Sequence, residues 1–438
     1  MPRSAVAMAW LALALGIPRE AAAQAASASP LNLGALLDSV ERANPLLTAA
    51  RASARAAAAM IAGAKRPPDP QLQIGWMNYV LPDLRPMESL GMTQLQAMQM
   101  LPLNGKLRLA GEAATARADA SAARVAGASF DLRARGAMAF YDLYATDGAL
   151  DAARDTRRLL VDVAAIAARM YEVGEGRQAD VLRANVELAR MDEDIIRMGA
   201  MRYAMAARLN ALQLAPDSAT VGEPAIPLFP AAVPPLDSLT RLADAGRPML
   251  RAAAQDVRAA ESRAELARRE LWPDLQVGVQ LGRQGGAMGP QTMGSLMVGA
   301  SVPVFAGSRQ LKMREEADAM RAMADADLVA MRVDTHGAIA EALANLTRAR
   351  RLAVLYRRSV LPQAEATVTS SLAAYRVGDV NLMTLLDAQM TLNRYRQELF
   401  TLEADEGKAW AELEMLTGHI LVEARTAQPL RRTGGSPR

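Results

Sequence analysis

The chain has 438 residues, of which 51% are hydrophobic, only 4% are aromatic and none is cysteine. A formal net charge of +3, without a basic block, argues against a nucleic-acid partner. Without cysteine we expect neither a disulfide framework nor a lipid anchor, and beyond the N-terminus no run of about 20 apolar residues could form a transmembrane helix.

The N-terminus has the pattern of an export signal. Arg3 provides a positive start, residues 5–17 are mostly apolar, and the small residues at 21–25 offer cleavage sites. The apolar run is too short to span a bilayer. We expect residues 1–25 to be a signal peptide; the alternative is a hydrophobic N-terminal helix of a cytoplasmic protein.

The first half of the chain alternates helical and strand patterns. An Ala-rich helical stretch at residues 33–65 ends at a cluster of prolines. Residues 71–80 alternate apolar and polar side chains, which predicts a strand with one apolar face, and residues 92–101 form a second, less regular candidate. A very long helix is predicted next, to about residue 170.

The second half repeats the first. Tyr171 and the Val-Gly turn after it reappear 204 residues later at Tyr375, while Leu72 of the first strand reappears 203 residues later as Leu275. Each half ends in an apolar heptad stripe whose one charged break falls at Arg202 or Glu406. A repeat this long predicts one two-fold architecture rather than independent domains.

The same patterns predict second-half strands at residues 275–282 and 296–304 and a long helix at 307–374. The predicted organisation is a signal peptide at 1–25, a first repeat at 26–214, a Pro-rich linker without regular helix at 215–238, a second repeat at 239–418 and an irregular tail at 419–438.

The lengths of the predicted helices fit together. Each long helix covers about 67 residues, or about 100 Å at about 1.5 Å per residue, and the two shorter helices of a half add up to about the same length. A short pair stacked end to end can therefore run alongside one long helix. The predicted fold is mainly α, a rod of paired helices with strands at one end and Val-Gly turns at the other.

The strands favour a membrane pore. Ten residues match the span of a transmembrane β-strand, about 9–11 residues. Four strands cannot close a barrel, and open sheet edges are not tolerated in lipid, so several copies would have to pool their strands. The alternative is a soluble four-stranded layer that caps a coiled coil. The export signal favours the membrane.

The chain resembles TolC-type outer-membrane efflux proteins. The resemblance rests on the duplicated helix–hairpin–helix–helix order, the two Tyr-x-Val-Gly turns and the Leu-Leu-Asp-Ala-Gln run at residues 385–389. It implies a homotrimer with a small transmembrane β part, a twelve-stranded barrel above an α-helical periplasmic tunnel. It also implies a periplasmic adaptor and an inner-membrane pump of the resistance–nodulation–division type as partners, and a place in the Gram-negative outer membrane.

The two turns are candidate contact sites. Gly174 and Gly378 suit the left-handed conformation that ends a helix, which is a structural role. The resemblance implies a second role, in which Val173, Gly174, Val377 and Gly378 form the periplasmic tip that meets the adaptor.

Acidic residues near the turns are candidates for a gate. In a symmetric assembly Asp180 and Asp387 would form carboxylate rings that draw cations, and the resemblance implies a gate there, with Tyr375 bonding across helices. The alternative readings are an i,i+3 pair of Asp180 with Arg183 and an ordinary exposed acid at Asp387. The sequence departs from the family pattern at Thr384 and Val380, where a second acid and a locking arginine are absent.

Methionine is abundant, with 25 residues, and crowds both strand regions. Thioethers suit Cu(I) or Ag(I), but methionine also packs helices well, so direct metal contact stays open. The methionines concerned are Met77, Met87, Met92, Met98, Met100, Met288, Met293 and Met297.

No catalytic or nucleotide-binding motif is present, so we expect neither an enzyme nor a cofactor. His336 and His419 are too far apart in sequence to suggest a metal pair. The sequence favours a passive exit duct for metal ions or small toxic compounds. The alternatives are the outer-membrane channel of a type I protein secretion system and a non-conducting periplasmic coiled-coil scaffold.

Overall fold

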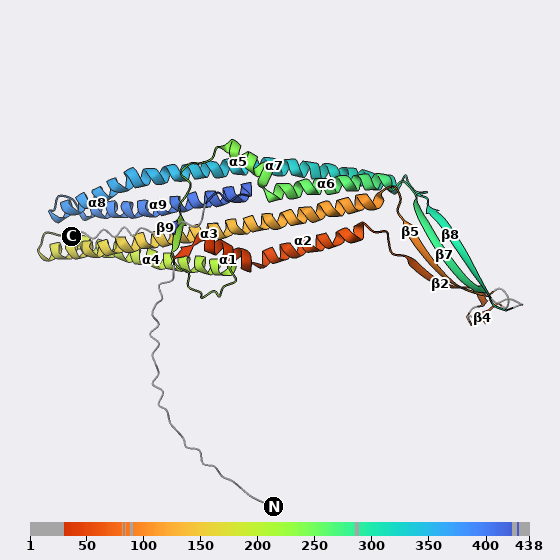
Figure 1. The fold of residues 1–438 in the computed structure, drawn as a ribbon. Coiled ribbons are helices and arrows are strands. Elements are labelled where there is room, and N and C mark those ends of the chain that lie inside the picture. Colours follow the sequence, from red (N-terminus) through yellow and green to blue (C-terminus); the bar gives the residue numbers. More distant parts are fainter. Residues whose placement is uncertain are drawn as a thin grey trace, which may run out of the picture.

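The computed structural model describes residues 30–422 apart from 81, 84, 88–90 and 285–288, together with residues 427 and 428. The expected signal peptide, most of the expected tail and Met288 lie outside these residues. The described body is an elongated rod of helices with a β-sheet at one end and two helix–helix turns at the other (Figure 1). This confirms the predicted placement of strands and turns.

Both halves follow the same order, except that the path of α7, η2 and α8 in the second half takes the place of the single helix α3. The first half contains α1 (Leu33–Ala43), α2 (Pro45–Ala64), β2 (Gln71–Met77), β5 (Met92–Leu101), α3 (Lys106–Glu172) and α4 (Gln178–Leu212). The second half contains α5 (Leu236–Gly246), α6 (Pro248–Arg269), β7 (Asp274–Gln284), β8 (Gln291–Ser301), α7 (Gln310–Leu355), the π turn η2 (Tyr356–Val360), α8 (Leu361–Arg376) and α9 (Leu382–Thr417).

The first helical stretch is two helices, so the prediction of one continuous helix at 33–65 was wrong. The break is at Asn44, whose backbone is extended with ψ 126°. Pro45 excludes the helical conformation from the residue before it. Asn44 instead caps α2, because its side-chain oxygen accepts a hydrogen bond from the Leu46 amide at 3.0 Å.

The first strand is shorter than predicted and ends at Met77. Asn78 has a φ of 55°, which turns the chain out of the sheet. The next residues form β3 (Tyr79–Val80), which pairs with β4 (Arg85–Pro86) in a small separate hairpin. The second strand, β5, has the predicted bounds.

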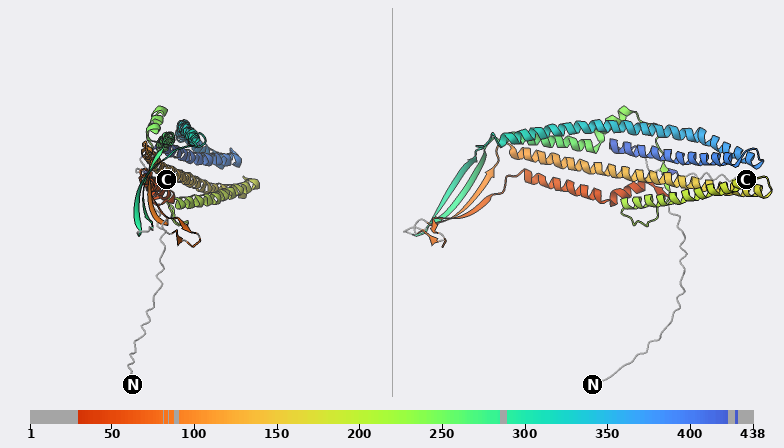
Figure 2. Two further views of the ribbon diagram at one scale, coloured as in Figure 1. Left: turned by 90° about the vertical axis from the view of Figure 1, so that its right-hand side faces the viewer. Right: turned by 180° about the vertical axis from the view of Figure 1, so that it is seen from behind.

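The helices pair as their lengths predict. In the first half α2 and α4 both pack along α3, one following the other, as Figure 2 shows from behind. In the second half α6 and α9 pack along the continuous path of α7, η2 and α8. The halves join because α3 also packs against α6 and α9. No helix among the described residues is long and apolar enough to cross a membrane.

The π turn accounts for the change of repeat offset from 203 to 204. Buried residues of α7 up to Ala353 correspond to buried residues of α3 only at an offset of 203, as Leu346 does to Leu143. Beyond the turn, buried Ser371 corresponds to buried Ala167 at an offset of 204. A π turn takes up one extra residue within a helix. Pro362, at the start of α8, was the available but unused signal for an interrupted helix.

The four long strands form one antiparallel sheet in the order β2-β5-β7-β8. The central pairing joins the two halves, with Ala97 of β5 opposite Val279 of β7. Strands β2 and β8 are the edges of the described sheet. The two hairpins therefore merge into one surface whose edges face away from each other.

A second set of short strands lies at mid-rod, where the linker crosses the helices. Strands β1 (Leu31–Asn32) and β6 (Pro224–Pro227) pair in parallel, and β6 also pairs with β9 (Ala427–Gln428). The largest aromatic cluster of the core lies nearby, with Phe140 and Tyr141 of α3 packed near Phe229 of the linker. The linker is thus built into the core rather than being a loose tether.

Candidate functional site

The two turns at the end of the rod have the same hydrogen-bond pattern. In the first, the amides of Gly174 and Glu175 donate to the carbonyls of Tyr171 and Met170 at 3.0 and 2.9 Å. In the second, Gly378 and Asp379 donate to Tyr375 and Ala374 at 3.1 and 2.9 Å. This is the Schellman arrangement, which satisfies the last carbonyls of a helix.

The glycines and valines of the turns are placed differently. Gly174 and Gly378 have φ values of 82° and 80°, the left-handed region that favours glycine. The structural role predicted for these glycines is therefore confirmed. Val173 and Val377 are 70% and 74% exposed at the end of the rod. Each turn thus presents an exposed valine to solvent, beside a backbone whose amides are hydrogen-bonded to the preceding helix.

The two tyrosines that precede the turns are not equivalent. Tyr171 is 48% exposed. Tyr375 is 5% exposed and lies in a cluster with Leu382 and Leu385. Burial, together with the negative charge of nearby Asp180, raises the pKa of Tyr375. No hydrogen bond of the Tyr375 hydroxyl is present within the described chain.

Asp180 and Asp387 occupy different surroundings. Asp180 is half-buried in the first turn of α4, where the helix dipole favours a negative charge, whereas Asp387 is exposed on α9. Neither carboxylate forms an ion pair with another described residue, so the pair with Arg183 is not formed. The structure brings Asp180 of one hairpin near Tyr375 of the other, while Asp387 stands apart.

Thr384 occupies the position in α9 that Asp180 has in α4. Its amide and hydroxyl both bond to the side-chain oxygen of Asn381, at 3.0 and 3.1 Å, so Asn381 caps the helix. The residue that stands in place of a second acid therefore takes part in a helix cap, and α4 has no such cap. Within the described tip, α9 therefore starts with a neutral side-chain cap, whereas α4 starts without a side-chain cap and has an acid, Asp180, in its first turn.

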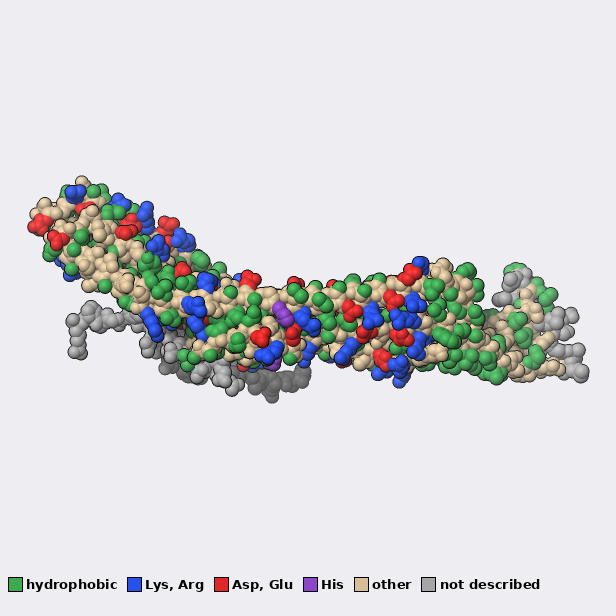
Figure 3. All heavy atoms as spheres, turned by 90° about the horizontal axis from the view of Figure 1, so that it is seen from above, with side chains coloured by type: hydrophobic (Ala, Val, Ile, Leu, Met, Phe, Trp, Pro, Cys, Tyr) green, Lys and Arg blue, Asp and Glu red, His purple; other side chains and the backbone are tan. Residues whose placement is uncertain are grey.

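The long strands have two chemically distinct faces. One face carries the exposed Leu72, Ile74 and Trp76 of β2 and continues across the sheet through aliphatic side chains of the paired residues. The opposite face carries mainly Gln, Gly, Ser and Met. Figure 3 shows hydrophobic side chains gathered toward the strand end of the rod, with charged side chains spread along the helices.

The charged break in the repeated stripe is an ion pair whose polarity is reversed between the halves. In the first half Arg202 of α4 bonds to Asp147 of α3, with Nε 2.7 Å from Oδ1. In the second half Arg350 of α7 bonds to Glu406 of α9, with Nη2 2.7 Å from Oε1. The sequence showed both breaks, but their partners lie about 55 residues away, and neither was predicted.

Both arginines also hold the linker. Arg202 donates to the carbonyl of Val221 at 3.2 Å, and Arg350 donates to Pro230 and Ala231 at 2.8 and 3.1 Å. Burial raises the pKa of Asp147, although its hydrogen bond to Arg202 opposes the shift. The ion pairs therefore fasten one linker to both halves at mid-rod.

A buried lysine joins the helices to the sheet, and sequence reasoning missed it. Lys106, the first residue of α3, is 4% exposed. Its Nζ lies 2.8 Å from the Asp274 carboxylate and 2.9 Å from the Trp272 carbonyl. Because Asp274 begins β7, this contact joins the start of α3 to the start of a central strand of the sheet. A lone lysine after a Pro-Leu-Asn-Gly turn gave no signal of this role.

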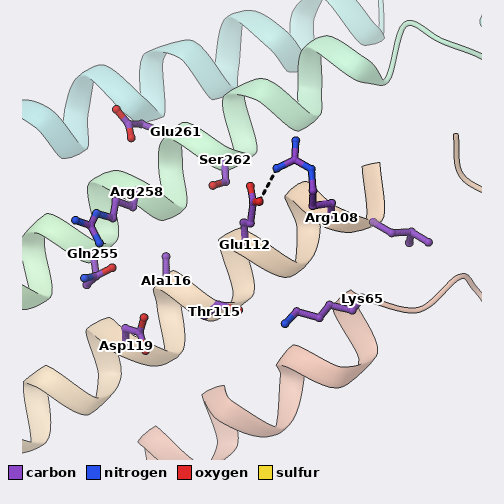
Figure 4. Close-up of a pocket in the computed structure, with 11 residues that line it drawn as sticks. Lys65, Arg108, Glu112, Thr115, Ala116, Asp119, Gln255, Arg258, Glu261 and Ser262 are labelled. Carbon is purple, nitrogen blue, oxygen red and sulfur yellow. Dashed lines mark hydrogen bonds and ion pairs between the residues drawn. The ribbon is translucent and has the colours of Figure 1, made fainter. Parts of the chain in front are cut away.

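A groove lies between α2, α3 and α6, toward the strand end of the rod (Figure 4). Its volume is about 770 Å³, and its lining mixes acids and bases. Arg108 and Glu112 pair within α3 at 2.5 Å, and both side chains are about half exposed. Among the described residues, this is a solvent-exposed groove with acids and bases in balance rather than an enclosed pocket.

Comparison with known proteins gives one matching stretch in each half of the chain. A family model described as outer membrane efflux protein matches residues 36–215 and 239–419. Among curated proteins, none matches the sequence.

Several solved structures share the fold. VceC from Vibrio cholerae, an outer membrane protein, is 19% identical, with a TM-score of 0.77 over 89% of this chain and 96% of that one. The outer-membrane channel OprN is 19% identical, with a TM-score of 0.75 over 88% and 89% of the two chains. CusC is 17% identical, with a TM-score of 0.74 over 89% and 93%. At these identities the likeness establishes the fold.

Proposed function

Because the chain belongs to the outer membrane efflux protein family, we propose that it is the outer-membrane duct of a tripartite efflux system. The single observation that carries the proposal is a four-stranded sheet, apolar on one face and polar on the other, at the end of a long helical rod. Among the described residues its edge strands β2 and β8 have no further partner. Such a sheet is complete only when copies of the chain join edge to edge.

The two edges are suited to each other. The strands alternate in direction, so β8 of one copy can pair antiparallel with β2 of the next. The internal pairing of β5 with β7 joins the second strand of one hairpin to the first strand of the next, and supplies the template. Carried over by the repeat offset of 203, the pair Ala97–Val279 becomes Ala300 opposite Trp76 of the neighbouring copy.

Three copies would close a twelve-stranded barrel. The apolar face with Leu72, Ile74 and Trp76 would meet lipid, and the Gln-rich face would line water. The rods would then form a tunnel that extends into the periplasm, with the Val-Gly turns farthest from the membrane. Twelve strands lie within the range of outer-membrane barrels.

The turns would form the docking and gating end. Val173 and Val377 are exposed apolar side chains next to the rigid turns of Gly174 and Gly378, which suits contact with a periplasmic adaptor. Asp180 beside Tyr375 would form a half-buried carboxylate ring, and Asp387 a solvated ring. Carboxylate rings at a narrow mouth attract cations.

Metal ions or small toxic compounds are the proposed cargo. Delivery would depend on an inner-membrane pump of the resistance–nodulation–division type, acting through the adaptor. This chain would contribute geometry alone, a water-filled path that opens when the helical ends separate.

The proposal is tested by conductance. Purified mature protein in planar bilayers with a potassium nitrate gradient is expected to give discrete, cation-selective channels. Asp180→Ala combined with Asp387→Ala should shift the reversal potential toward zero. Asp217→Ala with Asp237→Ala, which removes two exposed acids far from the turns, should leave the reversal potential unchanged. A water-soluble monomer that never conducts would overturn the proposed function.

A further inference from the structure

The methionines of the four long strands all lie on one face of the sheet. Side chains alternate between the two faces along each strand, and paired residues of neighbouring strands lie on the same face. The polar face carries Met77, Met92, Met98, Met100, Met293 and Met297. The apolar face of these strands carries none.

This segregation runs against the ordinary role of methionine. If methionine served only as an apolar filler, the Leu-, Ile- and Val-rich face would be its natural place. It is found instead among glutamines, glycines and serines, on the face that the proposed function assigns to water. An apolar side chain on a wet face needs another reason, and the thioether sulfur provides one.

Glycine brings two of these thioethers together. Met98 of β5, Gly278 of β7 and Met297 of β8 form one row across three strands. A side-chain carbon built on Gly278 would lie 3.1 Å from Met98 Cγ and 3.5 Å from Met297 Cε. The two methionines therefore share the space that the missing side chain leaves. Glycine within a strand often marks such a close approach.

The arrangement recurs farther along the sheet. A side-chain carbon on Gly282 would lie 2.8 Å from Met92 Sδ, and Met293 and Met77 are the partners of Gly282 and Met92 in the ladder. Met98 and Met92 are six residues apart on β5, or about 20 Å at about 3.3 Å per residue. The polar face thus carries two thioether clusters one above the other.

We propose that these clusters bind soft monovalent cations, Cu(I) or Ag(I), as stations for cargo that moves along the sheet. Neutral thioethers select soft cations, and they need not lose a proton to bind. Binding by a few thioethers without an anionic ligand is weak, which allows release, as conduction requires. This inference deepens the proposed function, because it names the cargo class of the same duct.

Silver nitrate titrated into the purified full chain, in chloride-free buffer, tests the proposal. Equilibrium dialysis with metal analysis should show saturable Ag(I) binding. Met98→Leu with Met297→Leu, a volume-conserving change, should weaken the affinity about tenfold or more. Met60→Leu with Met313→Leu, on exposed helix positions, should not. Zn²⁺ should bind all three proteins alike.

A second variant separates geometry from sulfur content. Gly278→Ala keeps every thioether but inserts a methyl group 3.1 Å from Met98 Cγ, and it should also weaken Ag(I) binding. Far-UV circular dichroism and oligomer size confirm that each variant is folded. Absent saturable binding, or equal affinity in the wild type and the Met98→Leu/Met297→Leu variant, would overturn the inference. Potassium conductance without Ag(I) binding would leave the proposed function standing and overturn this inference. Ag(I) binding by a protein that never conducts would support the thioether clusters and overturn the proposed function.

Discussion

In the first half of the chain the long helix α3 is continuous, whereas in the second half its counterpart is interrupted by the π turn η2 between α7 and α8. The ion pair at mid-rod is reversed in polarity, and the tyrosine before the turn is exposed in one half and buried in the other. The shared plan, helices in the same order around the same turns, survives all three changes.

The comparison separates what builds the rod from what distinguishes its sides. Apolar spacing, turns and strand register are common to both halves and set the architecture. The differences between the halves are local. They are the extra residue in η2, the exchanged charges of the mid-rod ion pair, and the side-chain cap that α9 has and α4 lacks. The two hairpins of the chain are therefore alike in fold but unequal in charge and burial at their ends.

Matched deletions should produce the largest contrast. Deleting Ser359 from the π turn removes the extra residue, so the buried register beyond it, including Tyr375, should be kept. The free energy of unfolding should fall by less than about 1 kcal/mol. The helix α3 has no extra residue of this kind, so deleting Leu159 rotates the rest of the helix by about 100° relative to its neighbours. That deletion should cost more than about 5 kcal/mol. Urea unfolding followed by circular dichroism measures both, and equal costs would contradict the interpretation of η2.

The reversed ion pairs should be nearly as important. Arg350→Ala leaves the Glu406 carboxylate buried and frees two linker carbonyls, so a loss of about 3–5 kcal/mol is expected. Arg202→Ala should cost less, because it frees one carbonyl. Arg350→Glu combined with Glu406→Arg copies the first-half polarity and should recover most of the loss. If it recovers none, the two sites are not interchangeable.

The turns should respond alike in the two halves. Gly174→Ala and Gly378→Ala each force a side chain into the left-handed region, at about 1–2 kcal/mol. Neither new methyl group meets a described atom within 4 Å, so the cost is purely conformational. Gly337→Ala, in open space inside α7, should instead stabilise by about 0.5–1 kcal/mol. Thermal unfolding of the three variants compares them directly.

The smallest predicted effect concerns Glu414 in α9. Burial raises the pKa of Glu414, although the amides of Leu421 and Val422 donate to its carboxylate at 2.8 Å. Its charge therefore costs stability at pH 7, and this cost disappears as the pH falls through the raised pKa toward the unfolded value. Glu414→Gln keeps the acceptor without the charge, so it should stabilise by about 0.5–1 kcal/mol at pH 7 and by nothing near pH 4. A pH-independent difference would contradict this assignment.

Much of the plan was predictable from residue spacing. Alternation at Leu72, Ile74 and Trp76 predicted β2, and the two Val-Gly turns predicted where helices end. The break at Asn44 was missed because the alanine pattern around it is helical on both sides. Contacts between distant residues, such as Lys106 with Asp274 or Arg350 with Glu406, had no local signal because they depend on how the halves pack.

The candidate site was predicted more unevenly. The turn glycines have the predicted conformation, whereas Asp180 and Asp387 share neither burial nor neighbours, which their nearness to a turn in the sequence cannot reveal. The approach of Asp180 to Tyr375 depends on the packing of one hairpin against the other. The single-face placement of methionine needed the strand register, since the poor alternation of Met92–Leu101 does not show which side chains share a face.

Disulfide formation across the open edges tests the closed sheet most directly. The chain has no cysteine, so Trp76→Cys with Ala300→Cys provides a clean pair. The account predicts covalent rings of three chains, and far lower yield from Ile74→Cys with Ala300→Cys, whose Cα atoms would lie about 7–8 Å apart or more. Cross-linking that stops at two chains, or fails in both variants while the protein stays folded, would contradict it.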